Sequence, residues 1–290
     1  MGAIAGWFGY VLNFLYDLVQ NYGLAIILFS VLLRIIMSPI TIKQQTSMEK
    51  SAKMQEEAKK LQVKYKNNPE KLNEETMQLY KREHFSPFSG CISAIVQFVI
   101  FLSVFYLVSR PLTYMKKVDS TLITNYEQEI SASGEQSSYP EIKVIEKKSA
   151  EDNNVYINMN FLGLDLSKVP MQNWQDPRVF IIPILYVITT FASIKLTTSL
   201  TNKKKKDNKA IEIKDNNGDK TTENVAEEQM ESMQQMSNSM TYMMPIMSIG
   251  IAMIAPLGLS LYWFISNLLQ LLERISIDFI KKMKKSNEEA

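Results

Sequence analysis

The stretch LAIILFSVLLRIIMSPITI, residues 24–42, decides the class of this chain. It is almost wholly apolar, and its length is close to the roughly 20 residues that a helix needs to cross a bilayer. Its only charged side chain, Arg34, lies near the middle, where an arginine costs roughly 2.5–3.5 kcal/mol on insertion scales. A charge in such a place usually faces a protein interior or a watery cavity, so the stretch predicts a spanning helix with a functional arginine.

A long side chain near the end of a span can instead reach the membrane surface. Arg34 precedes Ile42 by about eight residues, which corresponds to roughly 12 Å along a helix. This depth favours an interior role for Arg34 over the surface-reaching alternative.

The composition excludes several classes of function. The net charge is only +2 in 290 residues, so we expect no specific nucleic-acid partner. One cysteine, Cys91, and one histidine, His84, exclude an internal disulfide, a CxxC metal site and a histidine cluster. No Gly-rich phosphate loop or GxSxG motif is present, so we expect neither an enzyme nor a bound cofactor or metal. The first residues lack a basic segment and a cleavage site, so we expect no ordinary cleaved signal peptide.

Apolar blocks alternate with charged ones along the whole chain, as in a membrane protein with several spans. We expect an all-α fold with five transmembrane helices, at residues 24–42, 87–108, 179–199, 239–256 and 258–275. The connections are expected to be an external loop at 109–176, a cytoplasmic loop at 200–236 that is largely disordered, and a basic tail at 276–290.

Two further segments are predicted to form amphipathic helices. Residues 1–22 carry an apolar face, which favours a helix lying on the membrane, with an extra spanning helix as the alternative. That face consists of Trp7, Phe8, Val11, Phe14, Leu15 and Leu18. Residues 44–86 divide at Asn67-Asn68-Pro69, a turn signal, so we expect an antiparallel helical hairpin there, within a core unit of residues 23–290.

The distribution of lysine predicts the orientation in the membrane. Most of it lies in the hairpin, in Lys203–Lys206 and in the tail, whereas residues 109–176 hold more acid than base. By the positive-inside rule, the N-terminus is outside and the hairpin and C-terminus are cytoplasmic. Binding to anionic lipid is an alternative reason for these basic groups.

Several polar side chains fall on helical stripes inside the expected spans. Ser30 precedes Arg34 by four residues, so the two share one helix face, and Gln97 lies in the second span. In the fifth span, Tyr262 precedes a stripe formed by Trp263, Asn267 and Gln270. Such stripes turn toward each other or toward water.

Two explanations of these stripes remain open. Hydrogen bonds between helices, at about 0.6 kcal/mol each, explain Gln97, Asn267 and Gln270 at least as well as a functional role does. Arg34 differs, because we expect no acidic side chain in the spans to neutralise it. An unpaired buried charge predicts a hydrated cavity with room for an anion.

Four stretches, in this order, resemble the YidC/Oxa/Alb membrane-protein insertases, and specifically the short bacterial form without a large periplasmic domain. They are VLLRIIMSPITIKQQTSMEKSAKMQ (31–55), KLQVKYKNNPEKLNEETMQLYKREHFSPFSGC (60–91), FLGLDLSK (161–168) with IIPILYVITTF (181–191), and MPIM with APLGLSLYWFISNLLQ (244–270). The resemblance implies five helices around a hydrophilic groove in the bacterial plasma membrane. It also implies a chaperone that inserts nascent membrane proteins, alone or beside the Sec translocon.

The same resemblance implies roles for individual residues. Arg34 corresponds to the groove arginine, Ser30 to a nearby hydroxyl, Gln97 to the glutamine of the second helix and Trp263 to the aromatic residue of the fifth. The hairpin is similar to the region that receives substrates, and the basic tail to one that approaches the ribosome. Ile92-Ser93-Ala94 departs from the pattern, where a proline is expected, and residues 111–160 resemble an insertion.

Two other functions fit the sequence less well. A transporter of small anions could use Arg34 as its substrate site, but the chain lacks the internal repeat that many transporters have. An intramembrane enzyme would need a Ser/His pair, an Asp pair or a metal cluster in the spans, and none is present.

Overall fold

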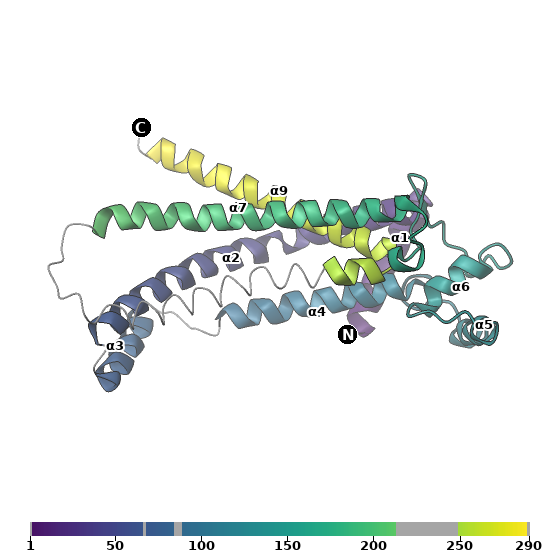
Figure 1. Ribbon diagram of the computed structural model, residues 1–290, viewed down its shortest axis with the longest axis horizontal. Helices are drawn as coiled ribbons and strands as arrows, with labels where there is room; N and C mark the ends of the chain where they lie inside the picture. The colour runs from purple at the N-terminus through teal and green to yellow at the C-terminus, as the bar shows by residue number, and fades with distance from the viewer. Residues whose placement is uncertain (1, 66–67, 84–88, 213–248, 289–290) are drawn as a thin grey trace.

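The computed structural model describes residues 2–65, 68–83, 89–212 and 249–288, in which long helices run side by side (Figure 1). The longest are α2 (Tyr22–Lys64), α4 (Ser89–Ser109), α7 (Ile181–Glu212) and α9 (Leu257–Glu288). α9 packs on each of the other three. The described residues are mainly helical, with two strands of two residues each, in agreement with an all-α membrane protein.

Three helices in the described part of the chain are long and apolar enough to cross a membrane: Gly2–Val19, Tyr22–Lys43 and Pro177–Leu196. The second and third overlap the expected first and third spans. The expected second span coincides with α4, in which the apolar helical part Ile95–Ser109 is shorter than the other three. The expected fifth span lies within α9.

Some expectations fall outside the described residues. Most of the expected span 239–256 and residues 213–236 of the expected cytoplasmic loop belong to this group. Of the fourth span, the structure describes a helical stretch at residues 249–254.

α2 is one continuous helix that includes the first span and the first arm of the hairpin. Asn21 caps its start by accepting a hydrogen bond from the Leu24 N–H (3.1 Å). The helix continues past Pro39, although proline removes one backbone hydrogen bond. The charged residues after the span are mostly good helix formers with no glycine or further proline, so nothing in the local sequence ends the helix earlier.

α3 (Pro69–Arg82) folds back on the end of α2 and completes the hairpin (Figure 1). Asn68 caps it by accepting from the Lys71 N–H (3.1 Å), and Pro69 occupies the first turn, where a missing N–H costs nothing. Met54 of α2 and Leu79 of α3 are buried. The hairpin thus holds a small apolar core of its own.

α1 (Gly2–Val19) is mainly apolar and packs on α2, α4 and the π-helical turn η1 (Leu112–Lys116). Its predicted apolar face divides in the structure: Phe8, Val11 and Leu15 pack against the core, while Trp7, Phe14 and Leu18 are exposed. Gly9 makes the closest approach, since a Cβ there would lie 1.8 Å from the carbonyl oxygen of Tyr114.

The expected external loop is a folded region at one end of the bundle (Figure 1). It contains α5 (Ser120–Ala132), α6 (Pro140–Lys148), the antiparallel strands β1 (Asn160–Phe161) and β2 (Leu164–Asp165), and the short helices η2 (Pro170–Gln172) and η3 (Pro177–Phe180). Leu162 and Gly163 both have positive φ, as the tight turn between two such strands requires. Buried apolar residues of this region continue the main core, among them Ile123, Ile142, Ile145 and Ile157.

The segment 158–168 holds the first residues of both α2 and α9. The Tyr22 N–H donates to the Asn158 carbonyl (3.0 Å), and the Leu257 and Gly258 N–H groups donate to the Lys168 and Leu166 carbonyls (2.9 and 3.0 Å). These bonds satisfy helix-end donors that have no partner within the helix. These hydrogen bonds also fix how α2 and α9 are aligned along their lengths.

Candidate functional site

Arg34 of α2 forms an ion pair with Glu273 of α9, between Nη2 and Oε2. Both side chains are mostly enclosed, at 21% and 13% exposed for Arg34 and Glu273. Arg34 Nε and Glu273 Oε1 are buried and have no hydrogen-bond partner among the described residues. The pair therefore neutralises charge without filling the hydrogen-bonding capacity of either group.

This pair corrects the expectation that no acid in the spans neutralises Arg34. Glu273 lies inside the expected fifth span, 258–275, and the expectation was wrong on this point. The stripe that contains Asn267 and Gln270 reaches Glu273 after three more residues, so extending it by one helical turn would have found the partner. The case for an unpaired charge in an empty hydrated cavity does not hold for this conformation.

Two more residues of α9 lie within electrostatic reach of Arg34. Arg274 interacts with both Arg34 and Glu273, and Arg34 acts on the hydroxyl of Tyr262, which hydrogen-bonds the Ser266 side chain. We call Arg34, Tyr262, Glu273 and Arg274 the Arg34 site. Glu273 neutralises Arg34 in this conformation, so an anion that binds Arg34 would take the place of Glu273.

Among the described residues, neither Ser30 nor Gln97 forms a hydrogen bond with Arg34. The Ser30 side chain is 3% exposed, and its hydroxyl donates to the Ile26 carbonyl of its own helix (2.7 Å). Gln97 is on an exposed turn of α4, near the exposed apolar residues Ile95 and Phe98. In the described part of the chain, no hydrogen bond holds the Gln97 side chain.

The polar stripe of α9 contributes to helix packing. Asn267 donates from Nδ2 to the Thr190 hydroxyl (2.8 Å) and accepts at Oδ1 from the Ser193 hydroxyl (3.1 Å), both on α7. This is the interhelical bonding that the sequence left open as an alternative. Gln270, one turn later, is exposed.

Trp263 is a packing residue in this conformation. Its ring, in a side chain 8% exposed, lies between Phe101 of α4 (centroids 5.9 Å apart, nearly parallel) and Tyr186 of α7 (6.2 Å). Tyr262 beside it is equally buried. Trp263 thus packs α9 against both α4 and α7, next to Tyr262 of the Arg34 site.

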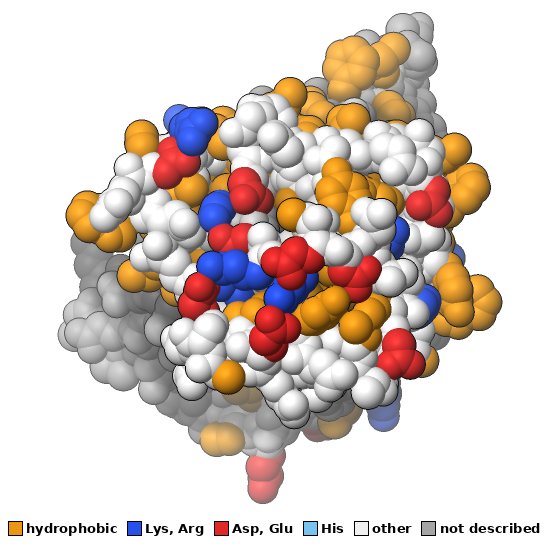
Figure 2. Space-filling view, turned by 90° about the vertical axis from the view of Figure 1, so that its right-hand side faces the viewer, with side chains coloured by type: hydrophobic (Ala, Val, Ile, Leu, Met, Phe, Trp, Pro, Cys, Tyr) orange, Lys and Arg blue, Asp and Glu red, His pale blue; other side chains and the backbone are white. Residues whose placement is uncertain are grey.

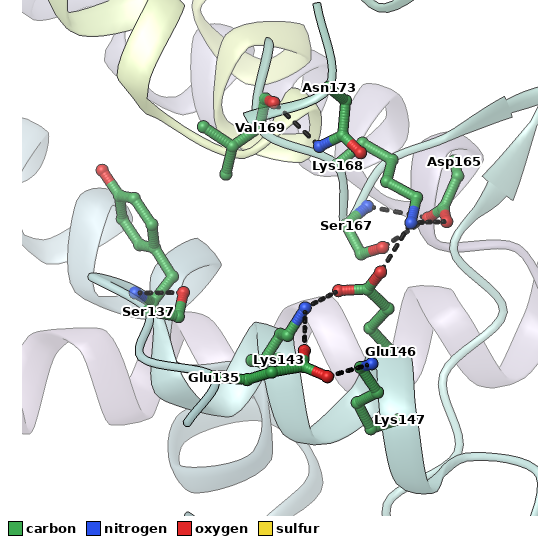
Figure 3. Close-up of polar contacts among 11 residues, drawn as sticks. Glu135, Ser137, Lys143, Glu146, Lys147, Asp165, Ser167, Lys168, Val169 and Asn173 are labelled. Atoms are coloured by element: carbon green, nitrogen blue, oxygen red, sulfur yellow. Dashed lines mark hydrogen bonds and ion pairs between the residues drawn. The ribbon is translucent and has the colours of Figure 1, made fainter. Parts of the chain in front are cut away.

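A second group of charges lies at the α5–α6 end (Figure 2). Lys143 pairs with Glu135 (2.9 Å) and Glu146 (3.1 Å), and Lys168 pairs with Glu146 (2.5 Å) (Figure 3). With Lys147 on Glu135 (2.6 Å) and Asp165 near Lys168 (4.0 Å), they form what we call the α6 charge cluster. A small polar cavity of about 120 Å³ adjoins it.

The pKa values of this cluster reflect its pairing. Hydrogen bonds from Lys147 and Lys143 lower the pKa of Glu135 to about 2. Burial tends to raise the pKa of Glu146, but hydrogen bonds from Lys168 and Lys143 outweigh it, so the net shift is downward. Three lysines face three carboxylates, and the cluster has no surplus charge with which to attract a ligand. Among the described residues, no group of three or more His, Cys, Asp or Glu is placed to hold a metal ion.

Comparison with known proteins identifies the family. The family model described as 60Kd inner membrane protein matches residues 14–286. The chain is 28% identical over 276 residues to the membrane protein insertase YidC of Treponema denticola, and 30% identical over 269 residues to that of Clostridium perfringens. These matches cover 95% and 92% of this chain.

The relatives differ in how much of their own length is matched. The chain spans 37% of the Treponema protein and 83% of the Clostridium protein. A relative from Caldanaerobacter subterraneus, 39% identical over 105 residues, is matched over 51% of its length. Since the family model covers nearly the whole chain, the chain belongs to the 60Kd inner membrane protein family, that of the bacterial YidC membrane protein insertases.

Proposed function

We propose that this protein inserts newly made membrane proteins into the bacterial membrane. The observation that carries the proposal is a partly buried arginine in an apolar helix of a chain from the insertase family. The positive charge of Arg34 would attract an acidic or polar tail of the substrate into the protein. This lowers the cost of moving the tail partway across the bilayer.

The energy for insertion would come from the substrate itself. A segment of about 20 apolar residues gains roughly 0.8 kcal/mol for each CH₂ that leaves water, which exceeds the cost of moving a short polar tail. Release sideways into lipid completes the reaction, so we propose no nucleotide or cofactor. The membrane potential would assist an acidic tail that moves outward.

The α2–α3 hairpin is the proposed receiving end. It lies at the opposite end of the bundle from α5 and α6 (Figure 1), and its amphipathic arms carry both charge signs. We propose that the hairpin, with the basic tail, faces the cytoplasm, and that the N-terminus and the α5–α6 region lie outside. The tail is then placed to approach a ribosome, and the exposed apolar side chains of α1 would contact lipid.

The test uses purified protein in sealed liposomes and a newly translated single-span membrane protein with a short acidic tail. Protease protection of the substrate is measured with the protein and with empty liposomes. We expect several-fold more protected substrate with the protein. Protection equal to that of empty liposomes, with protein shown to be folded, would contradict the proposal. Uptake of a labelled small anion would then test the transporter alternative.

A further inference from the structure

We infer that Glu273 is a specificity-determining residue, which competes with acidic substrate segments for Arg34. The inference rests on the insertion function proposed above and goes beyond it, because it assigns a role to the anion that occupies the arginine at rest. The argument uses the geometry of the pair, the charges around it and the position of the two helices.

The geometry shows that the pair can be displaced. An arginine has five N–H donors and binds a carboxylate best through two parallel hydrogen bonds. Glu273 meets Arg34 at Nη2, and the buried Nε remains without a partner among the described residues. A carboxylate that approaches Arg34 side-on could contact both nitrogens, so an incoming acid has a better contact available than Glu273 makes.

The charges show what the competition changes. With Glu273 ionised, the charge of Arg34 is neutralised in the ion pair. Without Glu273, Arg34 would keep its full positive charge. Glu273 thus weakens the attraction for every anion, and only a substrate with enough acidic charge near its apolar segment displaces it. A neutral polar tail gains less from Arg34 than an acidic tail does and is less affected by the competition.

The position of the helices allows the pair to separate without a change of fold. The first residues of α2 and α9 are tied to the segment 158–168 by backbone hydrogen bonds, far along both helices from the ion pair. Displacing the pair therefore requires side-chain movement without undocking either helix.

A purely structural role for the Arg34–Glu273 pair predicts a different result. If Glu273 only joined α9 to α2, its removal would reduce the folded fraction and lower the insertion of all substrates together. If Glu273 competes, its removal increases the preference for acidic over neutral tails. The ratio of two substrates, measured in one preparation, separates these effects because the amount of folded protein cancels.

The experiment uses two substrates that differ only in the tail, which carries two Asp residues in one and two Asn residues in the other. Protease protection is compared for wild type, E273Q and the control E127Q, which makes the same change on α5, away from the Arg34 site. We expect the Asp-to-Asn ratio to rise at least about threefold in E273Q and to stay unchanged in E127Q. In R34A/E273Q the ratio should fall to near one.

A second measurement tests the inference in case wild type inserts no substrate or E273Q does not fold. Binding of fluorescent peptides with the same two tails to detergent-solubilised protein gives the ratio of their Kd values without any insertion. If wild type inserts nothing, the proposed function fails, and the Kd ratio still decides the role of Glu273. If E273Q does not fold, E273D, with its shorter side chain, should raise the ratio less but in the same direction. An unchanged or lower ratio in the folded variant overturns the inference.

Discussion

The Arg34 site and the α6 charge cluster both contain lysine or arginine beside carboxylates, but they satisfy those charges to different extents. In the α6 charge cluster, Lys143 and Glu146 each have two partners of opposite charge, and charges balance. In the Arg34 site, the ion pair leaves Arg34 Nε and Glu273 Oε1 buried without hydrogen-bond partners among the described residues. Fully paired groups suit a structural cluster, whereas unfilled hydrogen-bonding capacity suits a site that receives a ligand.

The largest expected effect comes from removing the positive charge of Arg34. R34A should lower insertion of a substrate with an acidic tail by at least about tenfold, or about 1.4 kcal/mol, because the attraction is lost and Glu273 then repels the tail. R34K should retain part of the activity, since it keeps the charge but not the planar donor group. Protease protection in liposomes measures both.

The matched control for R34A is K168A, which removes a cation from the α6 charge cluster. It should change insertion less than about twofold, because that cluster has no surplus charge. Equal losses in K168A and R34A would show that the two groups of charges do not differ in function.

The next effect concerns the docking of α1 at the η1 turn. In G9A, the new Cβ would meet the Tyr114 carbonyl oxygen at 1.8 Å, so the backbone must move. We expect a loss of about 1–3 kcal/mol in stability, as for other overpacked sites, visible as a lower melting temperature in detergent. G6A is the control on the same helix, since its Cβ would meet only the flexible end of Lys117 at 3.5 Å. Equal melting temperatures for G9A and wild type would contradict this close packing.

A smaller effect distinguishes packing from substrate contact at Asn267. N267A removes two hydrogen bonds to α7 and should cost about 1 kcal/mol of stability, at roughly 0.6 kcal/mol per bond. It should lower the insertion of acidic-tailed and neutral-tailed substrates equally. A change in their ratio, at unchanged melting temperature, would move Asn267 from packing into the substrate site.

The sequence predicted the spanning character of α2 and α7 because long apolar runs leave few alternatives for a chain. It missed the fold of residues 110–176, whose apolar side chains, such as Ile142 and Ile145, are single residues in polar surroundings. Their burial depends on contacts that are distant in sequence, such as those between α5 and α6. Helical periodicity alone does not report such contacts.

For the candidate site, the sequence predicted the arginine but not its environment. Arg34 was evident because a charge in an apolar run is costly. The partner Glu273 was missed because it lies near the end of its span, among charged residues that read as the beginning of the tail. The burial of Trp263 between Phe101 and Tyr186 could not be predicted either, since it depends on how α4 and α7 pack around α9.

The smallest expected effect is the pH dependence of the α6 charge cluster. The pKa of Glu135 is lowered from 4.5 in the unfolded chain to about 2, so its ionised form stabilises the fold. That contribution is fully present above pH 4.5 and is lost as the pH falls toward 2. E135Q lacks it at every pH, so wild type should melt slightly higher than E135Q at pH 7 and at the same temperature near pH 2.

The control for this pH dependence is E127Q, on α5, which lies outside the cluster. Its melting temperature should follow that of wild type at both pH values. If the difference between wild type and E135Q persisted near pH 2, the stabilisation would come from side-chain packing rather than from charge. The α6 charge cluster would then owe less to its balanced ion pairs than its geometry indicates, and the contrast with the Arg34 site would rest on the unpartnered atoms of that site alone.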